Sequence, residues 1–341
     1  MKKIAIAGAG FAGLSTAWHL LQYPFVSVTL FDPKGIGGGA SGVSTGLLHP
    51  FPGKLSRKSW QADVGMKSTA ALISQVEEGW GRKVADRTGV LRLARTGQQQ
   101  HDFRKVLDDS CSWWPVEKVL EFLPQAAPVP ALWIPEGITV YSKLYLEGLW
   151  LECCKKGATH KMEPFHSPEQ FDQVVYATGF ETLNIPFLAQ AVHQFKLKSS
   201  RGQSLLCRWS ESTPCSLLSE GHLSPTEDPD LCQLGSTYEP IDSPFDVGKA
   251  LALKEKIALF YPPARHFEVV ETRVGTRIAR DRGYRPVVMK IDPKNWVFSG
   301  LGSRGLLYHA WLGEALAEAL MKDYDHLCPY DLYKSLFVLN P

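Results

Sequence analysis

The sequence predicts an α/β protein in which a doubly wound, Rossmann-type domain carries an interleaved domain built on an antiparallel β-sheet. Three observations lead to this fold class. Residues 3–32 follow the order strand, glycine turn, helix and strand. The apolar segment Phe171–Gly179 has the length of a buried strand and ends in Ala-Thr-Gly. Beyond about Phe195, short alternating segments are separated by turn residues, as in an antiparallel sheet.

The first of these segments carries a nucleotide-binding fingerprint. The apolar strand Lys3–Ala7 runs into Gly8-Ala9-Gly10-Phe11-Ala12-Gly13, and helical spacing follows. Gly8 permits a tight turn, Gly10 lets a pyrophosphate approach the backbone, and Gly13 lets the helix pack closely on the strand. Asp32 ends the second strand, where it is placed to accept the ribose hydroxyls. Its carboxylate would repel a 2′-phosphate, which favours FAD or NAD over NADP.

Two competing interpretations of this segment are an accidental glycine-rich turn and a signal peptide. Lys2 and Lys3 before an apolar stretch are typical of a signal peptide. The glycines within the stretch, and the second strand ending in Asp32, argue against both interpretations.

Length and composition leave room for two domains. The chain has 341 residues, 44% of them hydrophobic, and we expect no membrane span because no run of about 18 apolar residues occurs. The formal net charge of +2 favours neither acidic nor basic partners. We expect a cytoplasmic protein with reduced thiols and no metal site, because no Cys-x-x-Cys pair or zinc-type spacing links the seven cysteines, which are Cys111, Cys153, Cys154, Cys207, Cys215, Cys232 and Cys328.

A second glycine-rich segment, residues 35–46, follows Asp32. It contains Gly39-Ala40-Ser41-Gly42 and Gly46, and this density of glycine opposes a regular helix or central strand. Its backbone is suited to lie against a flat or anionic ligand, and a flexible loop is the alternative interpretation. Periodic apolar residues then predict a helix over 60–80, and residues 88–94 predict a strand of a different sheet.

The middle of the chain alternates between the two expected domains. A strand is predicted over 136–141, a helix over 144–156, and over 171–179 the strand that returns to the nucleotide domain. In FAD proteins with a doubly wound sheet, the glycine that ends such a strand, here Gly179, lies close to the adenosine. The antiparallel sheet is expected to include strands over 202–209 and 231–238, and an amphipathic helix is expected over 249–260.

The last informative segment is Trp296–Gly305, which precedes a predicted helix over 306–322. Gly300, Gly302 and Gly305 repeat the spacing of a nucleotide fingerprint. The following segment, 324–333, is polar and contains Pro329, so a second strand and a complete βαβ unit are not expected there. The helix N-terminus is instead suited to face the N1–C2=O edge of a flavin, where its dipole would stabilise negative charge.

Together these segments resemble the D-amino-acid oxidase-like (DAO) superfamily of FAD-dependent oxidoreductases. The matching positions run along nearly the whole chain: Gly8–Gly13 with Asp32, Gly39–Gly42 with Gly46, Arg201–Gln203, Gly235–Glu239, Arg277 and Gly300–Leu306. The subfamily that the chain looks most like is the oxidase domain of MnmC-type enzymes, which modify the wobble uridine of tRNA. Glycine oxidases are the next most similar.

The resemblance implies an FAD-binding domain made of residues 1–80, 136–194 and 287–341, and a substrate domain made of 81–135 and 195–286. Noncovalent FAD is implied, because no cysteine lies near 280–305, where relatives attach the flavin. The residues expected to bind FAD are Gly8, Gly10, Phe11, Ala12, Gly13, Asp32, Ala40, Ser41, Gly46, Gly179, Gly300, Gly302, Ser303, Arg304, Gly305 and Leu306.

The resemblance also implies oxidation of a carbon–nitrogen bond next to a carboxylate, by hydride transfer to flavin N5 with molecular oxygen as acceptor. An arginine is the expected carboxylate anchor, because its planar fork binds two oxygens. Arg277 is the first choice by its place in the motif, ahead of Arg280 and Arg285. A solvated surface charge is the alternative for any one of these arginines.

Three further side chains are candidates for the substrate side. His49, near the end of the second glycine-rich segment, is expected beside the flavin as a second catalytic candidate, and a structural histidine is the alternative. Tyr238 and Tyr284 are candidates to shape the pocket.

Three function classes compete. One is oxidation of an N-substituted glycine, such as carboxymethylaminomethyluridine in tRNA, and another is oxidation of a free amino acid such as glycine, sarcosine or a D-amino acid. The third is a flavin-binding protein that has lost turnover, which the altered segment Asp281–Met289 makes conceivable. A nicotinamide-only dehydrogenase would leave the glycine-rich segments 35–46 and 300–305 unexplained. Two basic groups are expected beside the active-site mouth if tRNA is bound: Lys54, Arg57 and Lys58, and Arg273, Arg277, Arg280, Arg282 and Arg285.

Overall fold

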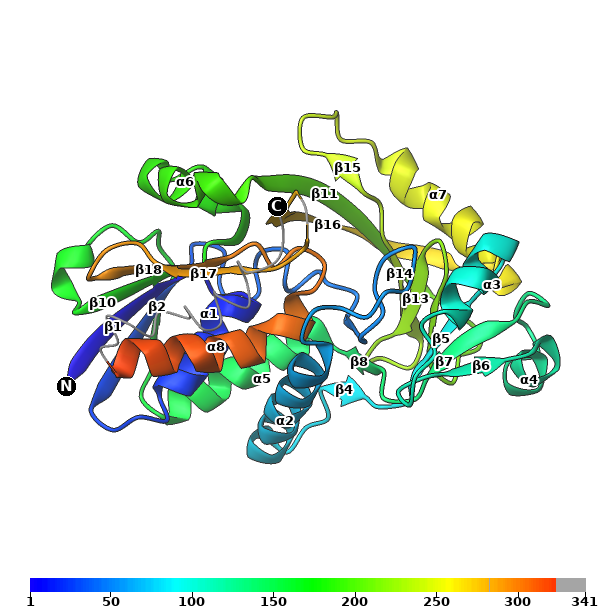
Figure 1. Ribbon diagram of the computed structural model, residues 1–341, viewed down its shortest axis with the longest axis horizontal. Coiled ribbons are helices and arrows are strands. Elements are labelled where there is room, and N and C mark those ends of the chain that lie inside the picture. The colour runs from blue at the N-terminus through cyan, green and yellow to red at the C-terminus, as the bar shows by residue number, and fades with distance from the viewer. Residues whose placement is uncertain (282, 323–341) are drawn as a thin grey trace.

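A six-stranded sheet forms one end of the molecule (Figure 1). The computed structural model describes residues 1–281 and 283–322. In the order β17-β18-β10-β1-β2-β9, neighbouring strands are parallel except at the β17 edge. The strands are β1 (Lys2–Ala7), β2 (Val26–Phe31), β9 (Thr159–Lys161), β10 (Gln173–Tyr176), β17 (Val287–Lys290) and β18 (Asn295–Ser299).

Helices cover both faces of this sheet, as expected for a doubly wound arrangement. Four long helices gather on one face: α1 (Phe11–Leu20), α2 (Ala62–Trp80), α5 (Ser142–Lys155) and α8 (Gly305–Met321). The opposite face is covered by α6 (Pro186–Val192) and by the loop that carries Phe165 and Phe171. Both faces are apolar, which explains why the strands of this sheet are continuous hydrophobic runs.

The helices α1 and α8 approach each other closely because small residues line their contact. A Cβ on Gly313 of α8 would lie 2.5 Å from the Ser15 hydroxyl oxygen of α1. That hydroxyl donates a hydrogen bond to the His309 carbonyl (2.8 Å). Gly13 lets α1 pack closely on the turn that precedes it, since a Cβ on Gly13 would overlap the Gly8 carbonyl oxygen. Helix α8 is therefore fixed beside the glycine turn Gly8–Gly13, which we call the nucleotide turn.

A nine-stranded, mostly antiparallel sheet forms the other end of the molecule (Figure 1). Its order is β15-β11-β14-β13-β12-β5-β7-β6, and β16 pairs with β11. Two long strands, β11 (Leu197–Arg208) and β16 (Glu268–Arg280), extend toward the six-stranded sheet. The others are β5 (Val90–Leu93), β6 (Ser112–Trp114), β7 (Ala131–Ile134), β12 (Ser216–Leu218), β13 (His222–Pro225), β14 (Leu231–Gly235) and β15 (Glu239–Pro240).

The nine-stranded sheet has one apolar and one polar face. On the apolar face, Leu205, Cys207 and Leu234 pack under helix α7 (Val247–Ala258). Alternate residues of β11, β13, β14 and β16 point the other way, and most of these are glycines or polar residues, among them Gly202, Ser204, His222, Gln233, Gly235, Gly275 and Arg277. The polar face is buried at several of these positions, so it is covered by other parts of the chain rather than by solvent.

The remaining elements connect the two sheets. A three-stranded sheet is formed by β3 (Leu47–Leu48), β8 (Ile138–Val140) and β4 (Ala85–Asp86). Short helices are α3 (Gly97–Arg104), α4 (Val116–Phe122), and the 3-10 turns η1 (Pro168–Gln170), η2 (Gly179–Leu183), η3 (His193–Phe195) and η4 (Pro262–His266). No helix in the described part of the chain combines the length and apolar character that a bilayer crossing requires.

The predicted fold class is confirmed, and the predicted elements differ from the observed ones mainly at their ends. Helix α2 begins at Ala62 rather than at residue 60, and α8 begins at Gly305 rather than at 306. Helices α3 and α4 were not predicted, because each is short and buries a single residue, Phe103 or Val119. The predictions for Arg282, Cys328 and 324–333 fall outside the described residues; the other six cysteines are free.

A buried histidine fixes the first turn of α8. His309 is fully buried, and its Nε2 lies 2.8 Å from the Tyr145 hydroxyl while Nδ1 lies 3.0 Å from the Leu306 carbonyl oxygen. The carbonyl must accept, so Nδ1 carries the proton and Nε2 accepts from the tyrosine. Burial lowers the pKa of His309 to about 4. The imidazole is therefore neutral at physiological pH.

This neutral His309 makes folding stability depend on pH. The unfolded chain binds a proton at the imidazole near pH 6.5, whereas the folded chain does so only near pH 4. Stability therefore falls as the pH decreases from about 6.5 toward 4. Between pH 7 and pH 5, we expect the wild type to lose about 1 to 2 kcal/mol more of its unfolding free energy than His309→Gln loses.

Urea unfolding at the two pH values measures this difference. His266→Gln is the matched control, because His266 is exposed, and it should keep the wild-type pH dependence. An unchanged pH dependence in His309→Gln would contradict the assignment.

Candidate active site

The nucleotide turn lies where β1, β2 and β10 end. Asp32, directly after β2, accepts a hydrogen bond from the Ala9 amide (2.9 Å), and its other carboxylate oxygen accepts a second backbone amide. Gly8 has a φ of +111°, and a Cβ there would overlap the Ala177 carbonyl oxygen just beyond β10. The structure thus brings Gly8, Asp32 and the segment leading to Gly179 together around one turn. Phe11, Ala12 and Gly13 form the first turn of the helix that follows.

The second glycine-rich segment folds back over the start of α1. The Ser41 hydroxyl accepts a hydrogen bond from the Phe11 amide (3.1 Å), and a Cβ on Gly10 would lie 2.7 Å from the same oxygen. At the other end of the segment, Gly46 has a φ of +77°, and a Cβ there would overlap the Val140 carbonyl oxygen. The segment is therefore packed against the nucleotide turn and against β8.

The same segment packs on the polar face of the nine-stranded sheet. A Cβ on Gly275 would lie 2.7 Å from Cγ2 of Val43, and one on Gly235 would lie 2.9 Å from Cγ2 of Thr45. Nε2 of Gln233 donates a hydrogen bond to the Val43 carbonyl (3.1 Å). Ala40 also lies against Gly275. The glycines of β14 and β16 thus allow a loop of the nucleotide-binding region to approach the other sheet.

Arg277 lies flat on this polar face. Its Nη2 donates to the Ser236 hydroxyl (2.9 Å), its Nη1 donates to the Thr237 carbonyl (3.4 Å), and its guanidinium carbon is 4.8 Å from the centre of the Tyr238 ring. A Cβ on Gly202 would lie 2.6 Å from both Nη atoms, so only glycine at 202 leaves space for this orientation. No carboxylate among the described residues forms an ion pair with Arg277.

A histidine that the sequence did not single out lies beside Arg277. His222 of β13 is opposite Gly235 of β14, and a Cβ on that glycine would overlap its Nε2. Burial, together with the positive charge of Arg277, lowers the pKa of His222 to about 3. Its Nε2 has no hydrogen-bond partner among the described residues. Only the β13–β14 register reveals this proximity, and no local motif marks it.

His49 belongs to the same electrostatic environment. It is 8% exposed, and its Nδ1 has no partner in the described part of the chain. Burial, together with the positive charges of Arg92 and Arg304 and the nearby His222, lowers the pKa of His49 to about 3. His49 and His222 are therefore both neutral at physiological pH, and the lasting charge at this site is that of the arginines.

The loop Gly300–Gly305, which leads into α8, joins the polar face of the nine-stranded sheet to the nucleotide turn. Gly302 has a φ of +57°, and its amide donates to the Ile278 carbonyl of β16 (2.8 Å). Gly305 lies against the Phe11 ring, which joins this loop to the nucleotide turn. The Arg304 guanidinium lies over Tyr284, 4.7 Å from the ring centre. Of the other predicted residues, Gly300 adopts a φ of +74°, Ser303 is exposed, and Leu306 is buried within α8.

The weaker arginine candidates lie elsewhere. The Arg280 guanidinium is 4.5 Å from the centre of the Phe195 ring, and that of Arg285 is 5.2 Å from the Trp60 ring. A further arginine, which the sequence analysis did not consider, is buried near the site. Arg92 donates to the carbonyl groups of residues 51 and 53 and thereby holds the segment that follows His49.

The comparison with protein families decides the class of protein. The family model DAO, FAD dependent oxidoreductase, matches residues 3–319. The chain belongs to this family. FAD is therefore its cofactor, and the members are oxidoreductases.

Individual relatives are more distant. The chain is 26% identical over 324 residues to the tRNA 5-methylaminomethyl-2-thiouridine biosynthesis bifunctional protein MnmC of Maricaulis maris (strain MCS10); the match covers 93% of this chain and 52% of that protein. The chain thus spans about half the length of this curated relative.

Two solved structures show the fold. Glycine oxidase from Geobacillus kaustophilus has a TM-score of 0.79 and 19% identity, with 95% of each chain covered. Iminodiacetate oxidase (IdaA) from Chelativorans sp. BNC1 has a TM-score of 0.75 and 19% identity, with 94% of this chain and 95% of that chain covered.

The residues present fit FAD. The first-turn amides of α1 have no acceptors within the helix. That of Phe11 donates to Ser41, and those of Ala12 and Gly13 are suited to phosphate oxygens. Asp32 keeps acceptor capacity for ribose hydroxyls, because each of its oxygens accepts one backbone amide only. Gly8 and Gly10 have no side chain of their own to cover the backbone there. The polar face adds Arg277 and unpartnered imidazole nitrogens, which suit a polar, anionic ligand.

We expect FAD to be bound without a covalent link. Among the described residues, no cysteine lies in or near residues 283–305 of the sequence, and most of the thiols are buried. Denaturing the yellow protein should release a chromophore with the mass of FAD, measured by mass spectrometry of the filtrate. Flavin that stays with the denatured chain would contradict this expectation.

We also expect Arg277 to bind the substrate carboxylate. Arg277→Ala should weaken the binding of carboxylate-bearing amines at least about a hundredfold, because one partner of a desolvated charge pair is lost. Binding is measured by titrating the oxidised flavin spectrum under anaerobic conditions, and FAD content should not change.

Arg273→Ala is the matched control for this prediction. Arg273 lies on the same face of β16 but is paired with Glu271 at 2.8 Å. Its removal should change carboxylate affinity less than about threefold, as surface pairs contribute little. Equal losses in both variants, or loss of flavin in Arg277→Ala, would contradict the role assigned to Arg277.

Proposed function

We propose that this protein oxidises the carbon–nitrogen bond of an amine that bears a carboxylate, and that the amine is an N-substituted glycine carried on tRNA, carboxymethylaminomethyluridine. The observation that carries the proposal is the environment of Arg277. Its guanidinium lies on the buried polar face, next to the packed glycine-rich segment, with no carboxylate of the described chain to neutralise it. A carboxylate of the substrate would complete this charge pair.

Each side chain near the site has a defined part in this proposal. Arg277 binds and orients the carboxylate, and Gly202 keeps the guanidinium in place across β11. His49 and His222 stay neutral, so they offer hydrogen bonds without adding positive charge. FAD, when bound, supplies the two-electron acceptor for the oxidation, and molecular oxygen is our proposed final acceptor. Holding the reacting carbon in one orientation is the main contribution of the protein.

The proposal includes the division of the chain. Residues 1–80, 136–194 and 287–341 form the FAD-binding domain, and 81–135 with 195–286 form the substrate domain. Every strand of the six-stranded sheet comes from the first set, and every strand of the nine-stranded sheet comes from the second. A cytoplasmic location belongs to the same proposal, because tRNA modification takes place there.

A second candidate function is the oxidation of a free amino acid such as glycine or sarcosine. The ion pairs of the basic side chains favour this candidate more than the count of basic residues in the sequence did. Lys58, expected to contact tRNA, is paired with Asp63 (2.9 Å) and Asp108 (3.2 Å). Arg273 is similarly paired with Glu271. Fewer basic side chains are thus available for phosphates than the count of basic residues suggested. The relationship to MnmC favours the tRNA-linked substrate.

Salt dependence separates the two functions. If tRNA carries the substrate, its affinity should fall linearly with salt concentration on a log–log plot, because bound phosphates release counterions. A free amino acid should show almost no slope. Filter binding of tRNA bearing carboxymethylaminomethyluridine at several salt concentrations measures this slope.

Turnover should agree with binding. The purified enzyme is incubated separately with this tRNA, with glycine, with sarcosine and with D-amino acids, and flavin reduction is followed under anaerobic conditions. Conversion of a free amino acid alone, without salt-sensitive tRNA binding, would overturn the proposed function in favour of the second candidate.

A further inference from the structure

Tyr238 is an exposed aromatic residue in a fixed position. Its side chain is among the more exposed large ones of the described chain, at 64% relative exposure. One face of its ring lies against Arg277, with the guanidinium carbon 4.8 Å from the ring centre. Tyr238 occupies the short segment between β14 and β15, next to Ser236 and Thr237, which accept hydrogen bonds from Arg277. The ring therefore adjoins the residue that we assign to the substrate carboxylate.

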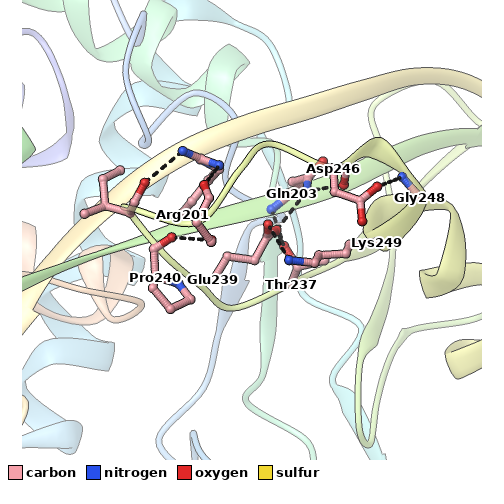
Figure 2. Close-up of polar contacts among 10 residues, drawn as sticks. Arg201, Gln203, Thr237, Glu239, Pro240, Asp246, Gly248 and Lys249 are labelled. Atoms are coloured by element: carbon pink, nitrogen blue, oxygen red, sulfur yellow. Dashed lines mark hydrogen bonds and ion pairs between the residues drawn. The ribbon is translucent and has the colours of Figure 1, made fainter.

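A buried polar network holds the segment between β14 and β15 against β11 (Figure 2). Glu239, which is 4% exposed, accepts hydrogen bonds from Nε2 of Gln203 (2.8 Å) and from the Thr237 hydroxyl (2.6 Å). The backbone amide of Gln203 in turn donates to the Thr237 hydroxyl oxygen (2.8 Å). Lys249 lies 3.6 Å from the second Glu239 oxygen. The residues on both sides of Tyr238 are thus fixed to β11.

The rest of the loop is tied to the same strand. Arg201 donates to the carbonyl groups of Ser243 (2.9 Å) and Ile241 (3.0 Å), and Gln203 also donates to the Asp246 carbonyl (2.9 Å) (Figure 2). An aromatic ring on so constrained a segment loses little conformational entropy when a ligand covers it. The outer face of Tyr238 is therefore suited to bind a flat ring.

We propose that Tyr238 is a nucleobase-binding residue, on which the pyrimidine ring of the modified nucleoside stacks. This inference rests on the proposed function, because it assigns a place to the uridine that carries the amine. Arg277 would hold the carboxylate, and a short linker joins that carboxylate to the base, so the base must come to lie near Arg277. Tyr238 is the exposed aromatic side chain that contacts this arginine. Single-stranded RNA is recognised by such stacking on aromatic and arginine planes.

Substrates with and without a base test this inference. We compare an anticodon stem–loop RNA bearing carboxymethylaminomethyluridine, the free modified nucleoside, and sarcosine, which is used as a substrate or, if it is not converted, as a competitor. Stacking of one base contributes about 1–3 kcal/mol. Tyr238→Ala should therefore lower kcat/KM for the RNA and the nucleoside at least about fivefold. Its effect on the kinetics or inhibition constant of sarcosine should be less than about twofold.

Two further variants serve as controls. Tyr238→Phe keeps the ring and should retain wild-type kcat/KM on all three compounds. Phe245→Ala removes another exposed aromatic side chain, which lies between β15 and α7 and is 57% exposed, and should leave all three values unchanged.

The outcomes separate this inference from the proposed function. If wild-type enzyme converts the RNA but Tyr238→Ala loses activity equally on sarcosine, Tyr238 only supports Arg277 and the inference is overturned. It is also overturned if Tyr238→Ala is unaffected on the RNA and the nucleoside. Wild-type enzyme that converts neither compound with a base would refute the proposed function itself, and the inference with it, before any variant is measured.

Discussion

The site depends on the absence of side chains at three positions on one face of the nine-stranded sheet. Gly235 and Gly275 allow Thr45 and Val43 of the glycine-rich segment to approach the sheet, and Gly202 allows Arg277 to lie across β11. Any larger residue at these positions would separate the loop from the sheet or displace the guanidinium. Close approach of backbone is a common reason for glycine within a strand. These three glycines therefore connect the nucleotide turn to the residue assigned to the substrate.

The electrostatics of the site follow from burial. Arg277 and Arg304 keep their positive charge, whereas burial leaves His49 and His222 neutral at physiological pH. Carboxylates of the described chain do not pair with Arg277, although acidic residues neutralise several basic residues outside the site, such as Lys58. A positive region maintained in this way favours an anionic ligand. It supports our proposal that the substrate is an amine that bears a carboxylate.

Local sequence predicted those parts of the fold and site that local chemistry determines. The turn at Gly8–Gly13 and the position of Asp32 follow from strand and helix periodicity, and the start of α8 follows from the glycines at 300–305. His222 and Arg92 were not predicted, because their importance depends on strand register and on burial between distant segments. Likewise, sequence alone did not show that Lys58 is paired with two carboxylates, those of Asp63 and Asp108.

A crystal structure of the FAD-bound protein with a carboxylate that cannot be oxidised would test the role of Arg277 most directly. We expect the carboxylate oxygens within hydrogen-bonding distance of the two Nη atoms, with the guanidinium still lying over Gly202. The glycine-rich segment should still pack against Gly275. A carboxylate bound to Arg304 or to Arg92 instead, with Arg277 making only its contacts to Ser236 and Thr237, would contradict the assignment.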